Sequence, residues 1–327
     1  MADGQVVPLG EEQHNRKPRN TPFRQQTMKA YKPVPTVKSA VIIFTTLGSI
    51  FIIVGSVLLS YSLEIIEHRK RYDNVGECDK TKYDRLSLCN ITFDVTDEMS
   101  STVYFYYELD NFYQNHRRYV KSKSQNQLMG NDLSKGSVST DCDPIVTMED
   151  LGIEPKYREG GWDLTDKDVA NPCGLIAKTF FNDTFIMWDQ NGHRVNILEN
   201  DIAWPSDKDR KFKNLKNWQK KQWKDVEDEH FIVWMRVSGL PNFRKLWGRI
   251  EDDLTVGTYT VQINSTYDVS DFDGKKYVVI STANALGGRN DFLGIAYIVV
   301  GGITILLAIA FFVRGYFFKK SQDLHYS

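Results

Sequence analysis

Catalytic signatures are missing from this sequence. It contains no His-Glu-X-X-His, no Gly-X-Ser-X-Gly and no phosphate-binding loop ending in Gly-Lys-Ser/Thr. His116, His193 and His230 are isolated from one another along the chain, so a metal or acid–base role for any of them is not expected. The chain has 42 acidic residues, and a catalytic pair of carboxylates for glycoside hydrolysis among them stays an open alternative. Such a pair is defined by the distance between its members in the fold and not by their spacing in the sequence. We therefore expect no catalytic residue and no cofactor.

Cysteine is also scarce, and its spacing argues against zinc. Four cysteines are separated by gaps of 10, 52 and 30 residues, whereas structural zinc sites use close pairs about two to four residues apart. The sequence also shows no internal repeat and no low-complexity tract. No metal site is expected.

Charge is absent from two long apolar runs, residues 39–63 and 292–313. They hold 25 and 22 residues, and each exceeds the roughly 20 that a helix needs to cross a bilayer. The first run follows 38 largely polar residues and is longer than the apolar stretch of a signal peptide, so we expect it to remain as an anchor. The predicted parts are tail 1–38, span 39–63, middle domain 64–291, span 292–313 and tail 314–327.

The distribution of charge indicates which side of the membrane each part occupies. Lys and Arg beside the first span are balanced, with five in residues 18–38 and five in residues 64–84. Over longer stretches the tails carry net charges of +4 and +2, and the middle domain carries −7. Basic segments favour the cytosolic side, so we expect both termini in the cytosol and the middle domain in the secretory lumen or outside the cell.

Cysteines and glycosylation signals agree with that orientation. All four cysteines, Cys78, Cys89, Cys142 and Cys173, lie between the two spans, together with the three Asn-X-Ser/Thr sites at Asn90, Asn182 and Asn264. An oxidising compartment with N-glycosylation accounts for both observations. Four cysteines allow three pairings, and the sequence alone does not select one. We favour Cys78 with Cys89 and Cys142 with Cys173.

The middle domain of 228 residues is predicted to be mainly antiparallel β, sandwich-like, with some helices and long loops. Residues 256–263 alternate between apolar and polar side chains, which is the period of a half-buried strand. Residues 102–109 are aromatic and β-branched, and the near-continuous apolar run 231–237 suits a strand buried on both faces. Tight turns are expected at Asn191-Gly192, between segments 185–190 and 193–198, and at Asp273-Gly274, before segment 277–281.

Helices are expected in two further places. Thr21-Pro22 offers an N-cap and a proline at the first position of a helix over residues 23–31. Residues 207–226 contain good helix formers, and residues 208–224 hold eight basic side chains interleaved with Phe212, Leu215, Trp218 and Trp223. We expect no nucleic acid on the exoplasmic side. The alternatives are therefore contact with lipid headgroups or an acidic partner, or an amphipathic helix resting its aromatic side on the domain.

Several strings are more specific than this periodicity. Asn20-Thr21-Pro22-Phe23-Arg24-Gln25-Gln26 lies near the N-terminus, and the middle domain holds Asn111-Phe112-Tyr113-Gln114-Asn115-His116-Arg117-Arg118-Tyr119-Val120-Lys121-Ser122. The others are Pro172-Cys173-Gly174-Leu175-Ile176-Ala177, Phe181-Asn182-Asp183-Thr184, Phe231-Ile232-Val233-Trp234-Met235-Arg236, Leu240-Pro241, Phe243-Arg244-Lys245-Leu246 and Phe292-Leu293-Gly294-Ile295-Ala296-Tyr297. Nearly end to end, the chain resembles the accessory β-subunits of phospholipid flippases, the cell-division-control protein 50 or ligand-effect-modulator family.

Three departures from the family pattern concern local loop shape. Pro22 stands where the family usually has alanine, and Asp291 where it usually has proline. Ala203-Trp204-Pro205-Ser206 is a variant of an Ala-Trp-Trp or similar string.

The resemblance implies a noncatalytic subunit that pairs with a ten-span, type-four P-type ATPase moving lipids between the leaflets of a membrane. Such subunits look like companions that the ATPase needs in order to fold and leave the endoplasmic reticulum, and their β-rich ectodomain covers the pump's lumenal loops. The family's disulfides link a close pair after the first span and a second pair that includes the Pro-Cys-Gly cysteine, which corresponds to the pairing favoured above. We therefore expect an integral membrane protein of the secretory pathway, in the endoplasmic reticulum, Golgi, endosome or plasma membrane.

Contact with the ATPase is expected at several points. The proposed interface residues are Asn20, Thr21, Phe23, Arg24, Gln25 and Gln26 in the tail and Phe112, Tyr113, His116, Arg117 and Arg118 in the middle domain. Small residues in the spans, Gly48, Gly55, Ser56, Gly294, Gly301 and Gly302, permit close helix packing, either on partner helices or on each other. Phe23 and Tyr31 have the alternative of lying in the membrane interface.

Two other classes of function compete with the subunit hypothesis. The large aromatic ectodomain and short tails also suit an independent cell-surface receptor or adhesion glycoprotein. The abundant carboxylates leave a membrane-tethered hydrolase as the third reading.

Overall fold

A computed structural model describes residues 20–29, 36–79, 87–152 and 164–325 of the chain. It divides into two compact units, residues 1–53 with 297–327 and residues 54–296.

Two long helices correspond to the predicted spans. Helix α1 (Val37–Leu63) and helix α10 (Asp291–His325) each contain a 27-residue apolar segment, with mean hydropathies of 2.5 and 2.6. The first predicted span lies within α1 and the second within α10. Helix α10 continues to His325, so the predicted tail from residue 314 begins as helix. This extension follows from the good helix-forming sequence after the apolar run, which has no glycine or proline after Gly315.

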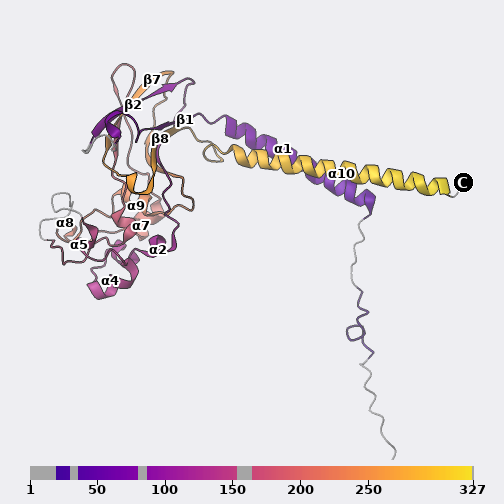
Figure 1. Ribbon diagram of the computed structural model, residues 1–327, viewed down its shortest axis with the longest axis horizontal. Helices are drawn as coiled ribbons and strands as arrows, with labels where there is room; N and C mark the ends of the chain where they lie inside the picture. The colour runs from indigo at the N-terminus through magenta and orange to yellow at the C-terminus, as the bar shows by residue number, and fades with distance from the viewer. Residues whose placement is uncertain (1–19, 30–35, 80–86, 153–163, 326–327) are drawn as a thin grey trace, which may run out of the picture. The chain divides into compact units, whose positions relative to one another are not determined.

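Glycines of the spans pack α1 against α10, side by side (Figure 1). In the first unit, a Cβ at Gly48 would lie 2.8 Å from Ile305, and one at Gly301 would lie 2.8 Å from Ile52. In the second unit, Gly294 makes the same kind of close approach to Leu59. Of the two alternatives for the small residues, these three glycines therefore serve packing within the chain, whereas a Cβ at Gly302 would meet nothing within 4 Å.

The helix predicted over residues 23–31 is wrong for the part that the structure describes. Residues 22–26 form a turn, closed by bonds from the Gln25 and Thr27 N–H groups to the carbonyls of Thr21 and Pro22, 2.9 and 2.8 Å long. Gln26 adopts a φ of +54°, which ends the helical geometry after one turn. Tyr31 lies outside the described residues.

Two four-stranded antiparallel sheets form the core of the second unit. Sheet A has the order β1-β8-β3-β6 and sheet B the order β2-β7-β4-β5. The strands are β1 (Glu67–Arg71), β2 (Ser87–Val95), β3 (Val103–Asp110), β4 (Thr184–Trp188), β5 (Arg194–Val195), β6 (Phe243–Ile250), β7 (Gly257–Ser265) and β8 (Lys275–Ser281). The mainly antiparallel sandwich predicted from the sequence is confirmed.

Alternating side chains explain how the two sheets pack. On β7, Tyr259, Val261 and Ile263 are buried, as predicted from the period of two, and the intervening residues lie on the outer face. On β3 the inner face contributes Phe105, whose ring lies 5.4 Å from that of Phe185 on β4. Aromatic contacts of this kind join the two inner faces into one core.

The two predicted tight turns behave differently. Asn191-Gly192 does form the β4–β5 hairpin, with Gly192 at φ +79° and an Asp189 N–H to His193 carbonyl bond of 2.9 Å. Asp273, at φ +56°, also turns the chain before β8. Its strands β7 and β8 belong to different sheets, so this turn is not a hairpin but a crossing from sheet B to sheet A.

Short helices fill the long connections between strands, and Figure 1 shows them gathered at one end of the sandwich. They are α2 (Arg117–Lys121), α3 (Gln125–Leu128), α4 (Lys135–Cys142), α5 (Met148–Leu151), α6 (Leu175–Lys178), α7 (Pro205–Arg210), α8 (Trp218–Lys221) and α9 (Glu229–Met235). The 3₁₀ turns η1 (Gly76–Cys78) and η3 (Ser270–Phe272) flank the strands. Disulfides join Cys78 to Cys89 and Cys142 to Cys173, with Cα atoms 5.4 and 5.6 Å apart, in the pairing favoured from the sequence.

The strand predicted over residues 231–237 is wrong, because this apolar run forms helix α9. Asp228 caps the helix, and its carboxylate accepts a 3.0 Å bond from the His230 N–H. Helix α9 buries side chains on most of its sides, including those of Phe231 and Trp234. Its apolar residues therefore follow one another along the chain and do not recur with the period of a half-buried helix. A short apolar run of this length does not separate a buried helix from a buried strand.

The single helix predicted over residues 207–226 is also wrong. Helices α7 and α8 are short, and Asn217 between them has a φ of +57°. The Gln222 side chain accepts a 2.9 Å bond from the Leu215 N–H, which competes with helical bonding. Phe212, Leu215 and Trp223 are nevertheless buried, so the aromatic side of the segment rests on the domain from loops rather than from one helix.

Candidate partner interface

The twelve-residue string 111–122 divides into residues that build the domain and residues that face solvent. Asn111 has a φ of +63°, and its side-chain amide donates a 2.6 Å bond to the Phe272 carbonyl. Gln114 is fully buried and accepts a 2.9 Å bond from the Ser238 N–H. Phe112 packs edge-to-face within an aromatic cluster, with its ring centroid 5.1 Å from that of Phe272. Phe112, which we predicted at an interface, is therefore placed largely inside the domain.

The remaining predicted interface residues of that string are exposed. Tyr113 has an exposed fraction of 57 %, and His116, Arg117 and Arg118 lie at the start of α2 with exposed side chains. This loop presents one aromatic ring and two guanidinium groups on the surface. Tyrosine and arginine are enriched in protein interfaces.

The predicted interface residues of the N-terminal string belong to the first unit and share the turn described above. Asn20, Thr21, Arg24, Gln25 and Gln26 are all exposed. Phe23 has an exposed fraction of 78 %. The Thr21 hydroxyl accepts a 3.3 Å bond from the Arg24 N–H. The turn therefore presents the exposed ring of Phe23 next in sequence to the basic side chain of Arg24.

The three candidate glycosylation sites lie on or beside the outer face of sheet B. Asn90 on β2 and Asn264 on β7 occupy the alternating strand positions whose side chains point outward. Asn264 also pairs with Thr184 on β4. Asn182, which is exposed, precedes the first residue of β4 by two positions. The fold thus brings sites that are 174 residues apart in sequence (264 − 90) to one side of the sandwich.

A buried polar cluster between the sheets was not expected from the sequence. The Lys276 ammonium is 2 % exposed and donates to Asp183, Ser265 and the Tyr267 carbonyl at 2.7, 2.8 and 2.6 Å. Asp183 also accepts a 2.7 Å bond from the Tyr72 hydroxyl. Burial, together with the Asp183 charge, raises the pKa of Tyr72 well above its ordinary value.

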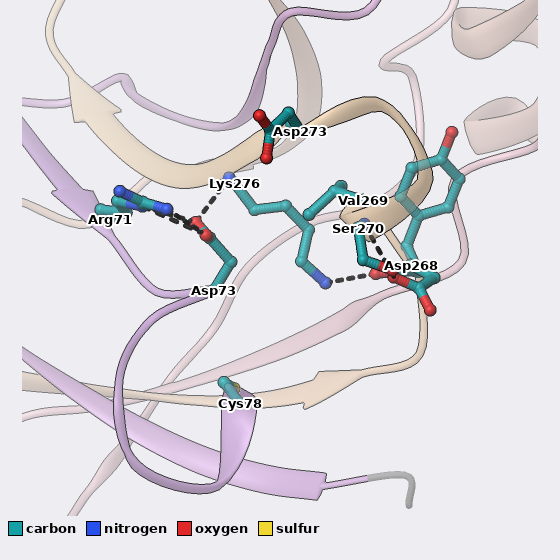
Figure 2. Close-up of a pocket in the computed structure, with 10 residues that line it drawn as sticks. Arg71, Asp73, Cys78, Asp268, Val269, Ser270, Asp273 and Lys276 are labelled. Carbon is teal, nitrogen blue, oxygen red and sulfur yellow. Dashed lines mark hydrogen bonds and ion pairs between the residues drawn. The ribbon is translucent and has the colours of Figure 1, made fainter. Parts of the chain in front are cut away.

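A cavity of about 260 Å³ lies beside this cluster. Figure 2 shows Arg71 and Asp73 against each other, with Lys276 of the neighbouring strand β8 beside Asp73. The Lys276 N–H donates a 2.7 Å bond to Asp73, whereas its ammonium points away toward the Tyr267 carbonyl. Because these charges are paired with one another, the arrangement fits a structural role at the junction of the two sheets.

A larger cavity of about 560 Å³ lies between β6, α9 and the start of α7. Its walls include Tyr106, Trp204, Arg236, Arg244 and Lys245. The Lys245 ammonium donates to the carbonyls of Val233 and Arg236 at the end of α9. Burial, with a smaller contribution from the charge of Arg236, lowers the pKa of Lys245 to about 7.

Sequence reasoning missed this groove as a site, although residues of three strings noted above line it: 203–206, 231–236 and 243–246. Within the described ranges, no group of three or more His, Cys, Asp or Glu side chains could hold a metal ion.

Comparison with known proteins gives consistent similarities along the whole chain. The family model described as LEM3 (ligand-effect modulator 3) family / CDC50 family matches residues 58–321. "ALA-interacting subunit 3" of Arabidopsis thaliana is 39 % identical over 91 % of this chain and 86 % of its own length. "Cell cycle control protein 50A" of Mus musculus is 34 % identical over 98 % and 95 %, and the "Phospholipid-transporting ATPase accessory subunit CRF1" of Saccharomyces cerevisiae is 29 % identical over 96 % and 88 %.

Proposed function

This chain belongs to the LEM3/CDC50 family, and on that premise we propose that it is the accessory β-subunit of a type-four P-type ATPase that transports phospholipids. The similarity carries the proposal, because relatives named as interacting or accessory subunits match the chain almost from end to end. The chain is an integral membrane protein whose two apolar helices flank the β-sandwich in the sequence. Its partner is the ATPase α-subunit, in a heterodimer embedded among membrane lipids.

In this proposal the chain contributes no catalysis of its own. The α-subunit hydrolyses ATP and moves the lipid, while this subunit stabilises the pump and allows its export from the endoplasmic reticulum. The absence of catalytic signatures in the sequence and the paired state of the charges around Lys276 support a binding role.

We further propose that both termini are cytosolic and that residues 64–291 lie on the exoplasmic side. The two disulfides and the basic tails support this orientation. Glycans on Asn90, Asn182 and Asn264 would then cover the outer face of sheet B. Proteolysis of sealed vesicles tests the orientation: the segment between Cys78 and Asn264 is expected to be protected, and its digestion from the cytosolic side would contradict the proposal.

Contacts with the pump are proposed at three levels. In the tail they involve the exposed turn around Phe23 and Arg24, and in the ectodomain the exposed residues Tyr113, Arg117 and Arg118. Between the two, α10 offers Gly302, whose open surface permits close approach of a partner helix.

Depletion of the chain tests the escort function. Without it, the cell's type-four ATPase is expected to keep endoglycosidase-sensitive glycans or to be retained in the endoplasmic reticulum. Re-expression of the full chain should restore export. An ATPase that matures and transports phospholipid at the normal rate in depleted cells would contradict the proposal.

A further inference from the structure

A short turn of small, uncharged residues connects strand β8 to helix α10. Residues 283–288 are Ala-Asn-Ala-Leu-Gly-Gly, and Asn284 and Gly287 form an isolated antiparallel bridge, with backbone bonds of 3.1 and 2.9 Å. Gly287 has a φ of +105°, which glycine adopts without strain. The Leu286 N–H donates a 2.9 Å bond to the Asn284 side-chain oxygen. Leu286 therefore lies at the tip of the 284–287 turn, with an exposed fraction of 63 %.

The 284–287 turn is bonded to the last turn of helix α1. The Asn284 side-chain amide donates a 2.7 Å bond to the Tyr61 carbonyl, which is among the last four carbonyls of the helix and so has no helical partner. Tyr61 lies inside the apolar segment Val37–Leu63. Two residues of chain span at most about 7 Å, so the backbone of Leu286 lies within that distance of Asn284. The tip of the turn is therefore held close to the level at which the apolar segment of α1 ends.

The polar groups that follow the turn are paired with one another. The Asn290 N–H donates a 2.9 Å bond to the Ser62 hydroxyl. One oxygen of Asp291 accepts a 2.6 Å bond from that hydroxyl, and the other accepts a 3.1 Å bond from Arg289. The one base and the one acid of this junction thus neutralise each other. Because a polar group without a partner is costly in an apolar medium, this pairing allows the junction to lie against lipid.

Exposed apolar side chains also lie on the two helix ends beside the turn. Leu63 is the last residue of α1 and Phe292 the second residue of α10, and their exposed fractions are 59 % and 78 %. Tyr61 is 48 % exposed, and tyrosine is enriched where membrane helices meet water. The interfacial layer of a bilayer extends roughly 5–7 Å beyond the hydrocarbon core on each side. Leu286 thus adds to an apolar surface that is continuous with the two spans.

We propose that the 284–287 turn is a lipid-contacting loop, which inserts Leu286 into the interfacial layer of the bilayer on the ectodomain side and so ties the β-sandwich to the membrane surface. This inference goes beyond the proposed function, because it requires the two spans but no ATPase. Residues 283–288 contain no aromatic residue and no arginine, the types that form the centres of most protein interfaces. A lipid surface needs only an apolar tip with satisfied polar groups, and the turn supplies both.

A nitroxide label on Leu286→Cys tests this contact in the full-length chain, since the four native cysteines form two disulfides. In phosphatidylcholine nanodiscs, collisions of the label are measured with oxygen, which concentrates in the bilayer, and with a water-soluble nickel chelate. Ile303→Cys, in the apolar segment of α10, is the control for lipid. Leu240→Cys is the control for water, because Leu240 is 70 % exposed and precedes β6 at the end of sheet A opposite to Ser281. Relative to Leu240→Cys, the label at position 286 should lose collisions with the chelate and gain collisions with oxygen.

A label at position 286 that meets the chelate as often as the label at Leu240 would overturn the proposal and leave the subunit function standing. A label shielded from both oxygen and chelate would also overturn it, because protein would then cover the turn. The same label in the complex purified with its ATPase should give the same result as in the chain alone, whereas recovery of no ATPase would contradict only the proposed function.

A second label position separates insertion of Leu286 from mere closeness to the spans. Ala285 is exposed in the same turn and carries the label as Ala285→Cys. Addition of Leu286→Asp should raise the collisions of this label with the chelate, because a charge at the tip favours water over the bilayer. The same collision rates with and without Leu286→Asp would overturn the assignment of Leu286 as the inserted residue.

Discussion

Removal of the charge of Asp183 should strongly destabilise the ectodomain, because this carboxylate is the counter-ion of a buried lysine. Asp183 and Lys276 have exposed fractions of 0 % and 2 %, and their charged atoms are 2.7 Å apart. The other oxygen of Asp183 accepts bonds from the Thr266 and Tyr267 N–H groups, both 2.6 Å long. In Asp183→Asn the lysine charge loses its partner, and an amide replaces one acceptor with a donor.

Loss of one partner from a buried ion pair costs about 3–5 kcal/mol. At roughly 2–4 °C per kcal/mol for a domain of this size, the melting temperature should fall by about 10 °C. The substitution keeps the Asn182-X-Thr184 signal for glycosylation, so its effect on stability can be read separately from a lost glycan.

Unfolding of the full-length protein in detergent, followed by tryptophan fluorescence, measures this effect. Asp201→Asn is the matched control, because its carboxylate is 70 % exposed and its bond to Lys208 is 3.2 Å long; a change within about 0.5 kcal/mol is expected. The double substitution Asp183→Leu with Lys276→Met should cost less than the sum of the single changes. If Asp183→Asn were as stable as Asp201→Asn, the reasoning about this cluster would be refuted.

Three further predictions concern other parts of the ectodomain. Cys142→Ser removes a disulfide worth about 2–4 kcal/mol and should reduce the endoglycosidase-resistant complex more than Asn90→Gln does; equal resistance would count against it. Gly174→Ala should destabilise by more than about 1 kcal/mol, measured as a lower unfolding midpoint, because φ is +99° and a Cβ would collide with the Ser122 carbonyl; an unchanged midpoint would contradict this. Lys245 has a pKa lowered to about 7 in the fold, so the unfolded chain binds the proton more strongly and stability should rise with pH above 7, by up to about 1.4 kcal/mol per unit. Lys245→Met should abolish that rise between pH 7 and 9, and an identical slope in the variant would contradict the assignment.

Elements with a clear local signal could be predicted from the sequence. The spans have an uninterrupted apolar length sufficient to cross a bilayer, and β7 has a strict period of two with one buried face. The Asn191-Gly192 hairpin follows from the positive φ that its glycine supplies. One disulfide pairing was favoured from the sequence but not determined by it, because only the fold shows which cysteines lie close enough to bond.

Elements decided by tertiary contacts could not be predicted in the same way. Residues 231–237 were predicted as a strand because helix α9 is surrounded by the core and so has no polar face. The N-cap Asp228 was the local signal that could have identified the helix. Lys276 reads as a surface lysine, since its partner Asp183 is 93 residues away and lies in a glycosylation signal. Trp204 was noted for its string, but its exposure beside Arg236 depends on α7 and α9 meeting at β6.

Isolation of the full-length chain from its native membranes in mild detergent tests the central claim most directly. The account predicts that a type-four P-type ATPase is recovered with the chain in a one-to-one ratio, as the mass of the particle and the identity of its peptides would establish. Recovery of the chain without an ATPase, under conditions that keep its disulfides and its fold intact, would contradict the account and favour an independent surface receptor.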